Sequence, residues 1–118
     1  MVTNVHHHLN YLELPASDLD ATKTFFKAVF GWSFTDYGPD YTCVENQVIG
    51  IGFFRADLRA RTETGSALGV LFSADLEASL QAVNDAGGEI LKPTFEFPGG
   101  RRFQFADPSG NEFAVWAE

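Results

Sequence analysis

The sequence predicts an α+β domain built from two βαβββ modules, and two observations support this prediction. The first is a repeated order of patterns. Residues 8–55 and residues 67–118 each hold one strand-like segment, one helix-like segment and three further strand-like segments. The second is the polar segment 56–66 between them, which has no apolar period and is interpreted as a linker. The halves share little identity, so the prediction rests on the order of the elements.

The composition is that of a globular protein and limits the possible partners. A chain of 118 residues, 45% of them hydrophobic, is long enough for one domain with a buried core. The formal net charge of −8 disfavours nucleic acid as a partner, because an acidic protein repels phosphate backbones. No apolar run has the length of a membrane span, residues 1–10 lack the features of a signal peptide, and a single cysteine permits no disulfide framework. We therefore expect a cytoplasmic protein that binds neither nucleic acid nor a membrane.

The first module begins with an alternating strand and a phenylalanine-rich helix. Leu9 to Leu14 alternate between apolar and polar positions, and Pro15 is expected to end this strand. Ser17 is a suitable N-cap for a helix over residues 18–30. Gly31 fits the left-handed position that follows a helix. The buried stripe of this helix is expected to consist of Phe25, Phe26, Val29 and Phe30.

The remaining elements follow from alternation and from turn residues. Three strands are predicted over residues 33–37, 41–45 and 48–54, with turns between them. The second module then repeats the order, with a strand at 67–73, a helix that ends at Gly87 and strands at 89–95, 101–106 and 112–116. Two four-stranded sheets, each backed by one helix, are expected to form an open curved cup, a shape that suits a small-molecule site.

Three segments give the chain a resemblance to a known superfamily. They are LNYLELPASDLDATKTFFKAVFGW (9–32), LFSADLEASLQAVNDAGGEI (71–90) and GGRRFQFADPSGNEFAVWAE (99–118). The chain resembles the vicinal-oxygen-chelate superfamily of glyoxalases, bleomycin resistance proteins and dioxygenases, and within it short proteins described as related to lactoylglutathione lyase. The resemblance implies the glyoxalase/bleomycin-resistance/dioxygenase-like fold and often a homodimer. It does not choose among the reactions of the family.

The resemblance also implies where a metal ion is held in the metal-dependent members. Their ligands are His, Glu or Gln on the first, fourth, fifth and eighth strands. In this chain those positions fall on Tyr11, on Gly50 or Gly52, on Gly69 or Leu71, and on Ala114. Glycine, leucine and alanine side chains cannot donate to a metal ion. We therefore expect no metal site and no cofactor.

The sequence nevertheless places polar and aromatic side chains on the predicted cup faces. Glu13 shares a face with Tyr11, and these two are the candidates for a catalytic role. The alternative is a Glu13 at the rim, in water or paired with an arginine, because an unpaired inward carboxylate is costly. Arg102 suits an anionic group, whereas Trp116 is interpreted either as an aromatic wall or as a core or interface residue. The predicted ligand-binding residues are Tyr11, Glu13, Tyr41, Phe54, Arg102, Gln104 and Trp116.

Three further features are given structural interpretations. Glu112 shares the face of Ala114, but its place beside a turn predicts an exposed side chain. Cys43 has no cation close in sequence and is interpreted as a small hydrophobic residue. Residues 6–8 are histidines, and because consecutive strand residues point to alternate faces, all three cannot converge on one ion. They are expected to bind metal only adventitiously.

Three functions remain open at the level of sequence. The first is a metal-free protein that binds a small hydrophobic or aromatic molecule. The second is a lyase or dioxygenase of the glyoxalase type with a non-standard site. The third is an interaction module whose cup is filled by its own side chains. Whether the protein is an enzyme is therefore left open.

Overall fold

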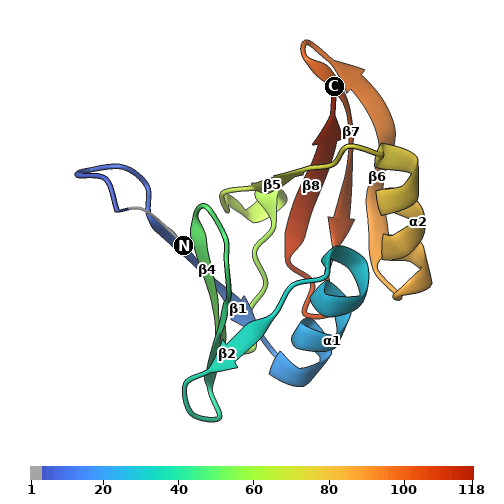
Figure 1. Cartoon of the computed structure of the whole chain (residues 1–118). Coiled ribbons are helices and arrows are strands. Elements are labelled where there is room, and N and C mark those ends of the chain that lie inside the picture. The colour runs from blue at the N-terminus through green and yellow to red at the C-terminus, as the bar shows by residue number, and fades with distance from the viewer. Residues whose placement is uncertain (1–3) are drawn as a thin grey trace.

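The computed structural model describes residues 4–118, which form two four-stranded sheets and two α-helices (Figure 1). The first sheet has the order β1-β4-β3-β2 and the second the order β5-β8-β7-β6, with β1–β4 and β5–β8 paired in parallel. This repeat confirms the predicted α+β architecture. The strands are β1 (Tyr11–Ala16), β2 (Phe34–Asp36), β3 (Tyr41–Val44), β4 (Gly50–Arg55), β5 (Gly69–Phe72), β6 (Glu89–Phe97), β7 (Gly100–Ala106) and β8 (Glu112–Ala117).

Both helices begin at an aspartate that caps the first turn. The helix α1 (Leu19–Phe30) has Asp18 as its N-cap, and the carboxylate accepts a hydrogen bond from the N–H of Ala21 at 3.0 Å. The expectation that Ser17 caps this helix is therefore wrong. Asp75 caps α2 (Leu76–Asp85) in the same way. Gly31 follows α1 with a φ of 70°, as predicted for the end of that helix.

Proline does not end the first strand as expected. β1 continues through Pro15, which pairs with Phe54, to Ala16. β1 is an edge strand, and an edge strand tolerates proline because half of its N–H groups have no partner strand. Pro93 lies within β6, an edge strand of the second sheet, at a shift in the register against β7. Segment 56–66 also contains a short 3₁₀ helix, η1 (Thr62–Thr64), which the sequence did not predict.

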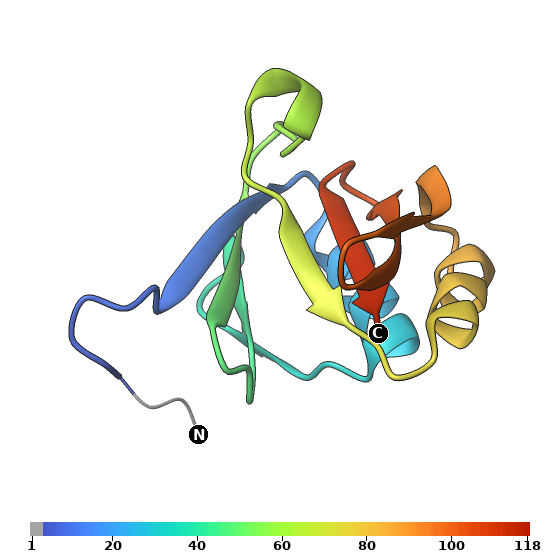
Figure 2. The same cartoon turned by 90° about the horizontal axis from the view of Figure 1, so that it is seen from above.

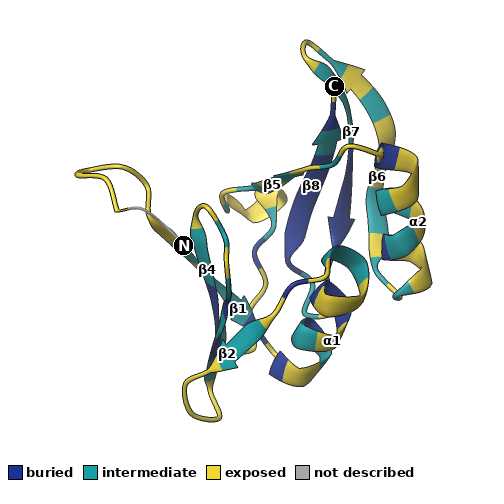
Figure 3. Ribbon diagram, viewed as in Figure 1, coloured by how far each residue is buried: buried dark blue, intermediate teal, exposed yellow. Residues whose placement is uncertain are grey.

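The two sheets share one aromatic core around α1. The ring of Phe26 lies 5.7 Å from that of Phe53 on β4, 5.3 Å from Phe113 on β8 and 4.7 Å from Trp32. α1 thus contacts both sheets and lies in the angle between them, whereas α2 covers the outer part of the second sheet (Figures 1 and 2). The most deeply buried strands, β7 and β8, lie against this core (Figure 3). The opposite side of each sheet points away from the core, and we call it the open face.

The turn between β7 and β8 joins the two halves through Asn111, which is completely buried. Its Oδ1 accepts a hydrogen bond from the N–H of Ala60 at 2.8 Å, and its Nδ2 donates to the carbonyl oxygen of Pro15 at 2.6 Å. The N–H of Glu112 donates in turn to the carbonyl oxygen of Ala60. One side chain therefore connects the end of β1, the segment between the sheets and the start of β8. Among residues 4–118, no helix is both long and apolar enough to cross a membrane.

We predict that Asn111→Ala lowers the free energy of unfolding by about 2–4 kcal/mol, because it leaves the buried N–H of Ala60 and the carbonyl of Pro15 without their partner. Urea denaturation measures this loss. Asn84→Ala on the exposed side of α2 is the matched control and should change the free energy by less than about 0.5 kcal/mol. An equal, small effect of both substitutions would contradict the role assigned to Asn111.

Candidate functional site

The open face of the first sheet is formed by alternate residues of three neighbouring strands. Tyr11 pairs with Gly50 and Glu13 with Gly52 across the parallel ladder. Tyr41 on β3 pairs with Phe54, so its ring lies beside the same part of β4. The residues that alternate with these pack toward α1, including Phe53 and Val44 in the buried core. The predicted residues Tyr11, Glu13, Tyr41 and Phe54 therefore lie on one surface.

Three of these side chains form a hydrogen-bonded chain. The hydroxyl of Tyr41 donates to Oε2 of Glu13 at 2.9 Å, and the hydroxyl oxygens of Tyr11 and Tyr41 are 2.5 Å apart. Because Tyr41 has a single hydroxyl proton, which Glu13 accepts, the Tyr41 oxygen must accept from Tyr11. The donor order is therefore Tyr11 to Tyr41 to Glu13. The partner of Glu13 is a tyrosine, not the arginine considered as the alternative from sequence.

The two glycines of β4 make room for this chain. A β-carbon on Gly52 would lie 2.0 Å from the Tyr41 hydroxyl and 2.3 Å from the Tyr11 hydroxyl. A β-carbon on Gly50 would lie 2.3 Å from the Tyr11 ring. Such separations are far inside van der Waals contact, so any side chain at either position displaces a tyrosine. The phenol groups occupy the space that a side chain of β4 would otherwise fill.

Burial shapes the acid–base properties of this face. Burial raises the pKa of Tyr41, and its hydrogen bonds with Tyr11 and Glu13 raise it further. Burial also raises the pKa of the Cys43 thiol, with a further contribution from the charge of Glu45. Tyr41 and Cys43 therefore remain protonated at neutral pH. This agrees with the interpretation of Cys43 as an unreactive thiol.

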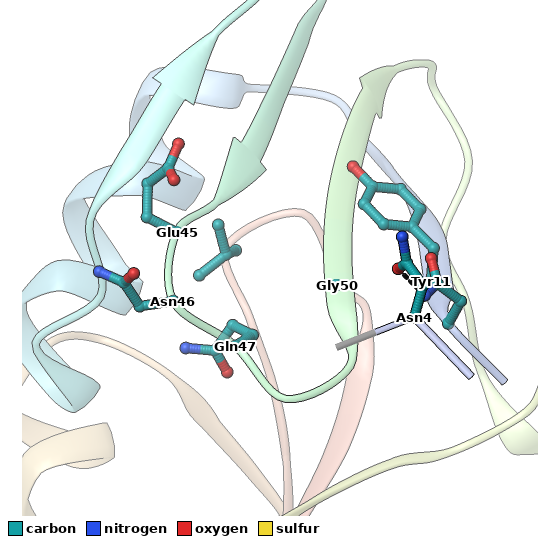
Figure 4. Close-up of a pocket in the computed structure, with 8 residues that line it drawn as sticks. Asn4, Tyr11, Glu45, Asn46, Gln47 and Gly50 are labelled. Atoms are coloured by element: carbon teal, nitrogen blue, oxygen red, sulfur yellow. Dashed lines mark hydrogen bonds between the residues drawn. The ribbon is translucent and has the colours of Figure 1, made fainter. Parts of the chain in front are cut away.

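A shallow pocket of about 270 Å³ lies beside this chain, between the start of β1 and the turn that joins β3 to β4 (Figure 4). Tyr11 borders the pocket and is 40% exposed. Most other lining groups are polar, including Asn4, Asn10, Glu45 and Gln47. The carboxylate of Glu45 accepts a hydrogen bond from the hydroxyl of Thr35.

The open face of the second sheet is aromatic around Arg102. Trp116 on β8 pairs with Arg102 on β7 and with Phe72 on β5. The Arg102 guanidinium lies over the rings of Phe95 and Phe97, 5.2 and 5.6 Å from their centroids. The Trp116 ring makes edge contacts with Phe72 and Phe97. We call Phe72, Phe95, Phe97 and Trp116 the aromatic cluster; Phe72 is 56% exposed.

A buried polar network borders the aromatic cluster. Glu112 is buried and not exposed as predicted, because the N–H and hydroxyl of Thr62 donate to its Oε1 and the Gln104 amide donates to its Oε2 at 2.5 Å. Burial would raise the pKa of Glu112, but these donors and the nearby charge of Arg61 outweigh it and lower the pKa. Gln104 Oε1 and Arg102 Nε are buried without a hydrogen-bond partner among the described residues. Both atoms therefore retain unused hydrogen-bonding capacity.

The residues at the expected metal positions do not fit a divalent ion. Tyr11 is bonded to Tyr41, and Ala114 offers no donor atom. The face predicted for the fifth strand is wrong, because Leu71 packs on the core while Val70 pairs with Ala114 on the open face. Among residues 4–118, no group of three or more His, Cys, Asp or Glu side chains is placed to hold a metal ion.

The histidine run forms a turn before β1 and not a strand. Its second residue has a φ of 63°, and the rings of His6 and His7 are stacked with their centroids 3.8 Å apart. The alternation expected of strand residues therefore does not apply to these histidines.

The structure sorts the predicted ligand-binding residues into two groups, one on each open face. Tyr11, Glu13 and Tyr41 are in contact on the first sheet, and Arg102, Gln104 and Trp116 are neighbours on the second. No hydrogen bond or aromatic contact in the described part of the chain joins the groups. Phe72, Phe95 and Phe97 were not among the residues predicted from the sequence. No local pattern shows that β6 brings two rings to Arg102.

Comparison with known proteins identifies relatives. The chain matches a family model described as the Glyoxalase/Bleomycin resistance protein/Dioxygenase superfamily over residues 8–115. It is 27% identical over 124 residues to the anthracycline biosynthesis proteins DauV of Streptomyces sp. (strain C5) and DnrV of Streptomyces peucetius. The match covers 90% of this chain and 45% of those proteins, so the chain spans about half the length of these curated relatives.

Solved structures give the same fold at low identity. A glyoxalase-related enzyme from Fulvimarina pelagi superposes with a TM-score of 0.79 at 19% identity, covering 95% of this chain and 88% of that one. The fosfomycin resistance protein FosX from Listeria monocytogenes gives 0.75 at 16% identity, covering 100% and 95%. Lactoylglutathione lyase from Agrobacterium tumefaciens gives 0.70 at 18% identity, covering 94% and 93%. At these identities the likeness concerns the fold alone.

We predict that Gly52→Ala disrupts the Tyr11–Tyr41–Glu13 chain and lowers the free energy of unfolding by about 1–3 kcal/mol, because the new methyl group overlaps both hydroxyls. Urea denaturation measures the loss. The same substitution in a protein that also carries Tyr11→Ala and Tyr41→Ala should lower the free energy of unfolding much less, because the overlapping hydroxyl groups are gone. Equal costs in both backgrounds would show that the glycine serves another purpose.

Proposed function

The chain belongs to the Glyoxalase/Bleomycin resistance protein/Dioxygenase superfamily, and we propose that it binds a flat aromatic small molecule in its cup without the metal ion of the family's metal-dependent members. The observation that carries this proposal is the aromatic cluster around Arg102 on the second sheet. Flat rings and an accessible cation favour a flat ligand with an electron-rich or anionic substituent.

The unpartnered polar atoms support a ligand on this surface. Arg102 Nε can donate one hydrogen bond and Gln104 Oε1 can accept one, and neither has a partner among the described residues. Both atoms are buried, so a ligand pairs with them only where the covering side chains move aside. Such pairing would recover part of the about 1–3 kcal/mol that a buried polar group without a partner costs. Polar atoms beside an apolar wall are the usual composition of a small-molecule site.

The proposed binding unit is a homodimer. The open faces point away from the core that the two sheets share, so within one chain they do not enclose a ligand. Apolar side chains are strongly exposed where the first sheet ends, with Val48 at 92% and Leu9 at 63%. Val70 and Phe72 on β5 add to this exposed apolar surface. A second copy that covers these side chains would oppose one open face to another and complete the cup.

We predict that a flat neutral probe, 2-methoxy-1,4-naphthoquinone, binds to the purified protein and that Trp116→Ala weakens its affinity about tenfold through the loss of ring contacts. Isothermal titration calorimetry measures both affinities. Tyr37→Ala removes an exposed aromatic ring outside the cluster and should leave the affinity unchanged. Added Zn²⁺, Ni²⁺, Mn²⁺ or EDTA should also have no effect, and lactoylglutathione lyase activity should be negligible with each metal. Metal-dependent binding or turnover would support the lyase or dioxygenase alternative instead.

We predict that the protein sediments as a dimer at micromolar concentration and that Val48→Glu shifts it toward the monomer, because a carboxylate cannot be buried in an apolar interface without a partner. Analytical ultracentrifugation measures the distribution. Leu58→Glu introduces a carboxylate at another exposed aliphatic residue and should leave the dimer intact. A monomeric wild-type protein at these concentrations would contradict the dimer.

A further inference from the structure

We propose that Tyr11, Tyr41 and Glu13 form a proton relay that couples the binding of an acidic hydroxyl group on the ligand to the gain of one proton by Glu13. The proposal rests on the proposed function, because it concerns the same ligand. It adds the chemical class of that ligand and a residue that responds to its charge. The proposal is supported by the donor order from Tyr11 to Tyr41 to Glu13 and by the space that the glycines of β4 leave for the two phenol groups.

The hydrogen bonds from the ligand to Glu13 need one more proton than the two tyrosines supply. A ligand oxygen at the Tyr11 hydroxyl creates three gaps between oxygen atoms, namely ligand to Tyr11, Tyr11 to Tyr41, and Tyr41 to Glu13. Each gap needs one proton to be a hydrogen bond. The two tyrosines supply two protons, and the ionised Glu13 supplies none. The third proton must come from the ligand hydroxyl or from solvent.

The transfer itself keeps both tyrosines neutral. The ligand hydroxyl gives its proton to the Tyr11 oxygen, Tyr11 gives its own to Tyr41, and Tyr41 gives its own to Oε2 of Glu13. One O–H bond breaks and one forms at each tyrosine, so the negative charge moves from Glu13 to the ligand oxygen. When the ligand arrives already ionised, solvent supplies the proton to Glu13 and the same final state results. The raised pKa of Tyr41 is consistent with this, because the relay never requires a phenolate.

The surroundings of the relay leave Glu13 as its acceptor. β4 presents Gly50, Gly52 and Phe54 to the chain, none of which titrates. On β3, Cys43 stays protonated. Glu45 follows that strand, and its carboxylate accepts a hydrogen bond from the Thr35 hydroxyl. Tyr37 follows β2. Asp40 directly precedes Tyr41, and its carboxylate is paired with Arg55, which follows Phe54 on β4, at 2.9 Å. The histidines at 6–8 lie before β1, and within residues 4–118 no hydrogen bond connects them to Tyr11, Tyr41 or Glu13.

The terminal carboxylate defines the class of ligand. Proton exchange along a hydrogen-bonded chain is most effective when the donor and the final acceptor have similar acidity. The final acceptor is a carboxylate, so the matching donor is a hydroxyl group about as acidic as a carboxylic acid, as in hydroxyquinones and the enols of cyclic 1,3-diones. The aromatic cluster favours a flat ring system. We therefore assign the ligand to the flat, acidic hydroxyquinone or enol class.

The test compares 2-hydroxy-1,4-naphthoquinone with its methyl ether, 2-methoxy-1,4-naphthoquinone, by calorimetric titration between pH 6 and pH 8. For wild type, the affinity for the hydroxyl compound should fall about tenfold per pH unit, because binding takes up one proton. The affinity for the methyl ether should not change with pH. Glu63→Gln on η1 removes the same charge at a position distant in sequence from Tyr11, Glu13 and Tyr41, and it should keep the tenfold slope. Tyr37→Phe should also keep it.

Glu13→Gln gives the sharpest result, because the glutamine amide supplies the third proton permanently. Its affinity for the hydroxyl compound should be independent of pH and about tenfold or more above that of wild type at pH 8. Tyr41→Phe should abolish the slope as well, since the chain is broken. A purely structural role for Glu13 would instead lower the affinity at every pH.

The outcomes separate this inference from the proposed function. If both compounds bind wild type with the same flat pH profile, the relay is overturned and the proposed function stands. If neither compound binds, the proposed function is overturned and the assigned ligand class falls with it. A tenfold slope that persists in Glu13→Gln also overturns the relay, because another group must then take up the proton.

Discussion

The buried side chain of Asn111 is the interaction on which the arrangement of the two sheets depends. It holds the end of β1 through the Pro15 carbonyl and the segment between the sheets through the Ala60 N–H. Its own N–H donates to Asp107, whose pKa burial raises to about 6 although several N–H groups lower it. At neutral pH that carboxylate is therefore largely ionised and is stabilised by the turn around it. With both chain segments fixed at one point, α1 is held in the angle between the sheets and the helix-facing sides of both sheets share one core.

A shared core determines which surfaces remain for function. Because Phe26 packs against both sheets, the apolar alternate residues of every central strand are used inside, and the other alternate residues form the open faces. The faces differ in chemistry. On the first sheet, two glycines opposite Tyr11 and Glu13 allow large phenol side chains to lie flat over β4 and to meet Glu13. On the second, aromatic rings surround a single guanidinium. Gly50 and Gly52 thus have two consequences, because they offer no donor atom to a metal ion and they leave room for the tyrosines.

The sequence predicted what depends on local periodicity. The order of elements, the apolar stripe of α1 and the glycine that follows it arise from spacing along the chain, and they agree with the structure. The sequence did not predict contacts that depend on register between distant strands. Tyr11 and Tyr41 are 30 residues apart, and their contact needs both the β1–β4 and the β3–β4 pairings. Glu112 was predicted to be exposed from its place beside a turn. Its partner Thr62 lies 50 residues away, in a segment without an apolar pattern, so no local spacing indicates its burial. Pro15 was misjudged because edge position is a property of the sheet and not of the sequence.

The two open faces have complementary chemical capacities, and this bears on selectivity. The aromatic cluster binds flat rings with little discrimination, since every aromatic molecule offers a face. Selectivity must therefore come from polar atoms with a fixed direction, and the chain from Tyr11 to Glu13 has one, because Tyr41 has a single proton to give. A ligand hydroxyl that brings its own proton, or an ionised one that binds together with a proton from solvent, completes the series of hydrogen bonds, whereas an ether leaves one gap without a proton. In an acidic protein of net charge −8, this requirement keeps the site from accepting a second uncompensated negative charge beside Glu13.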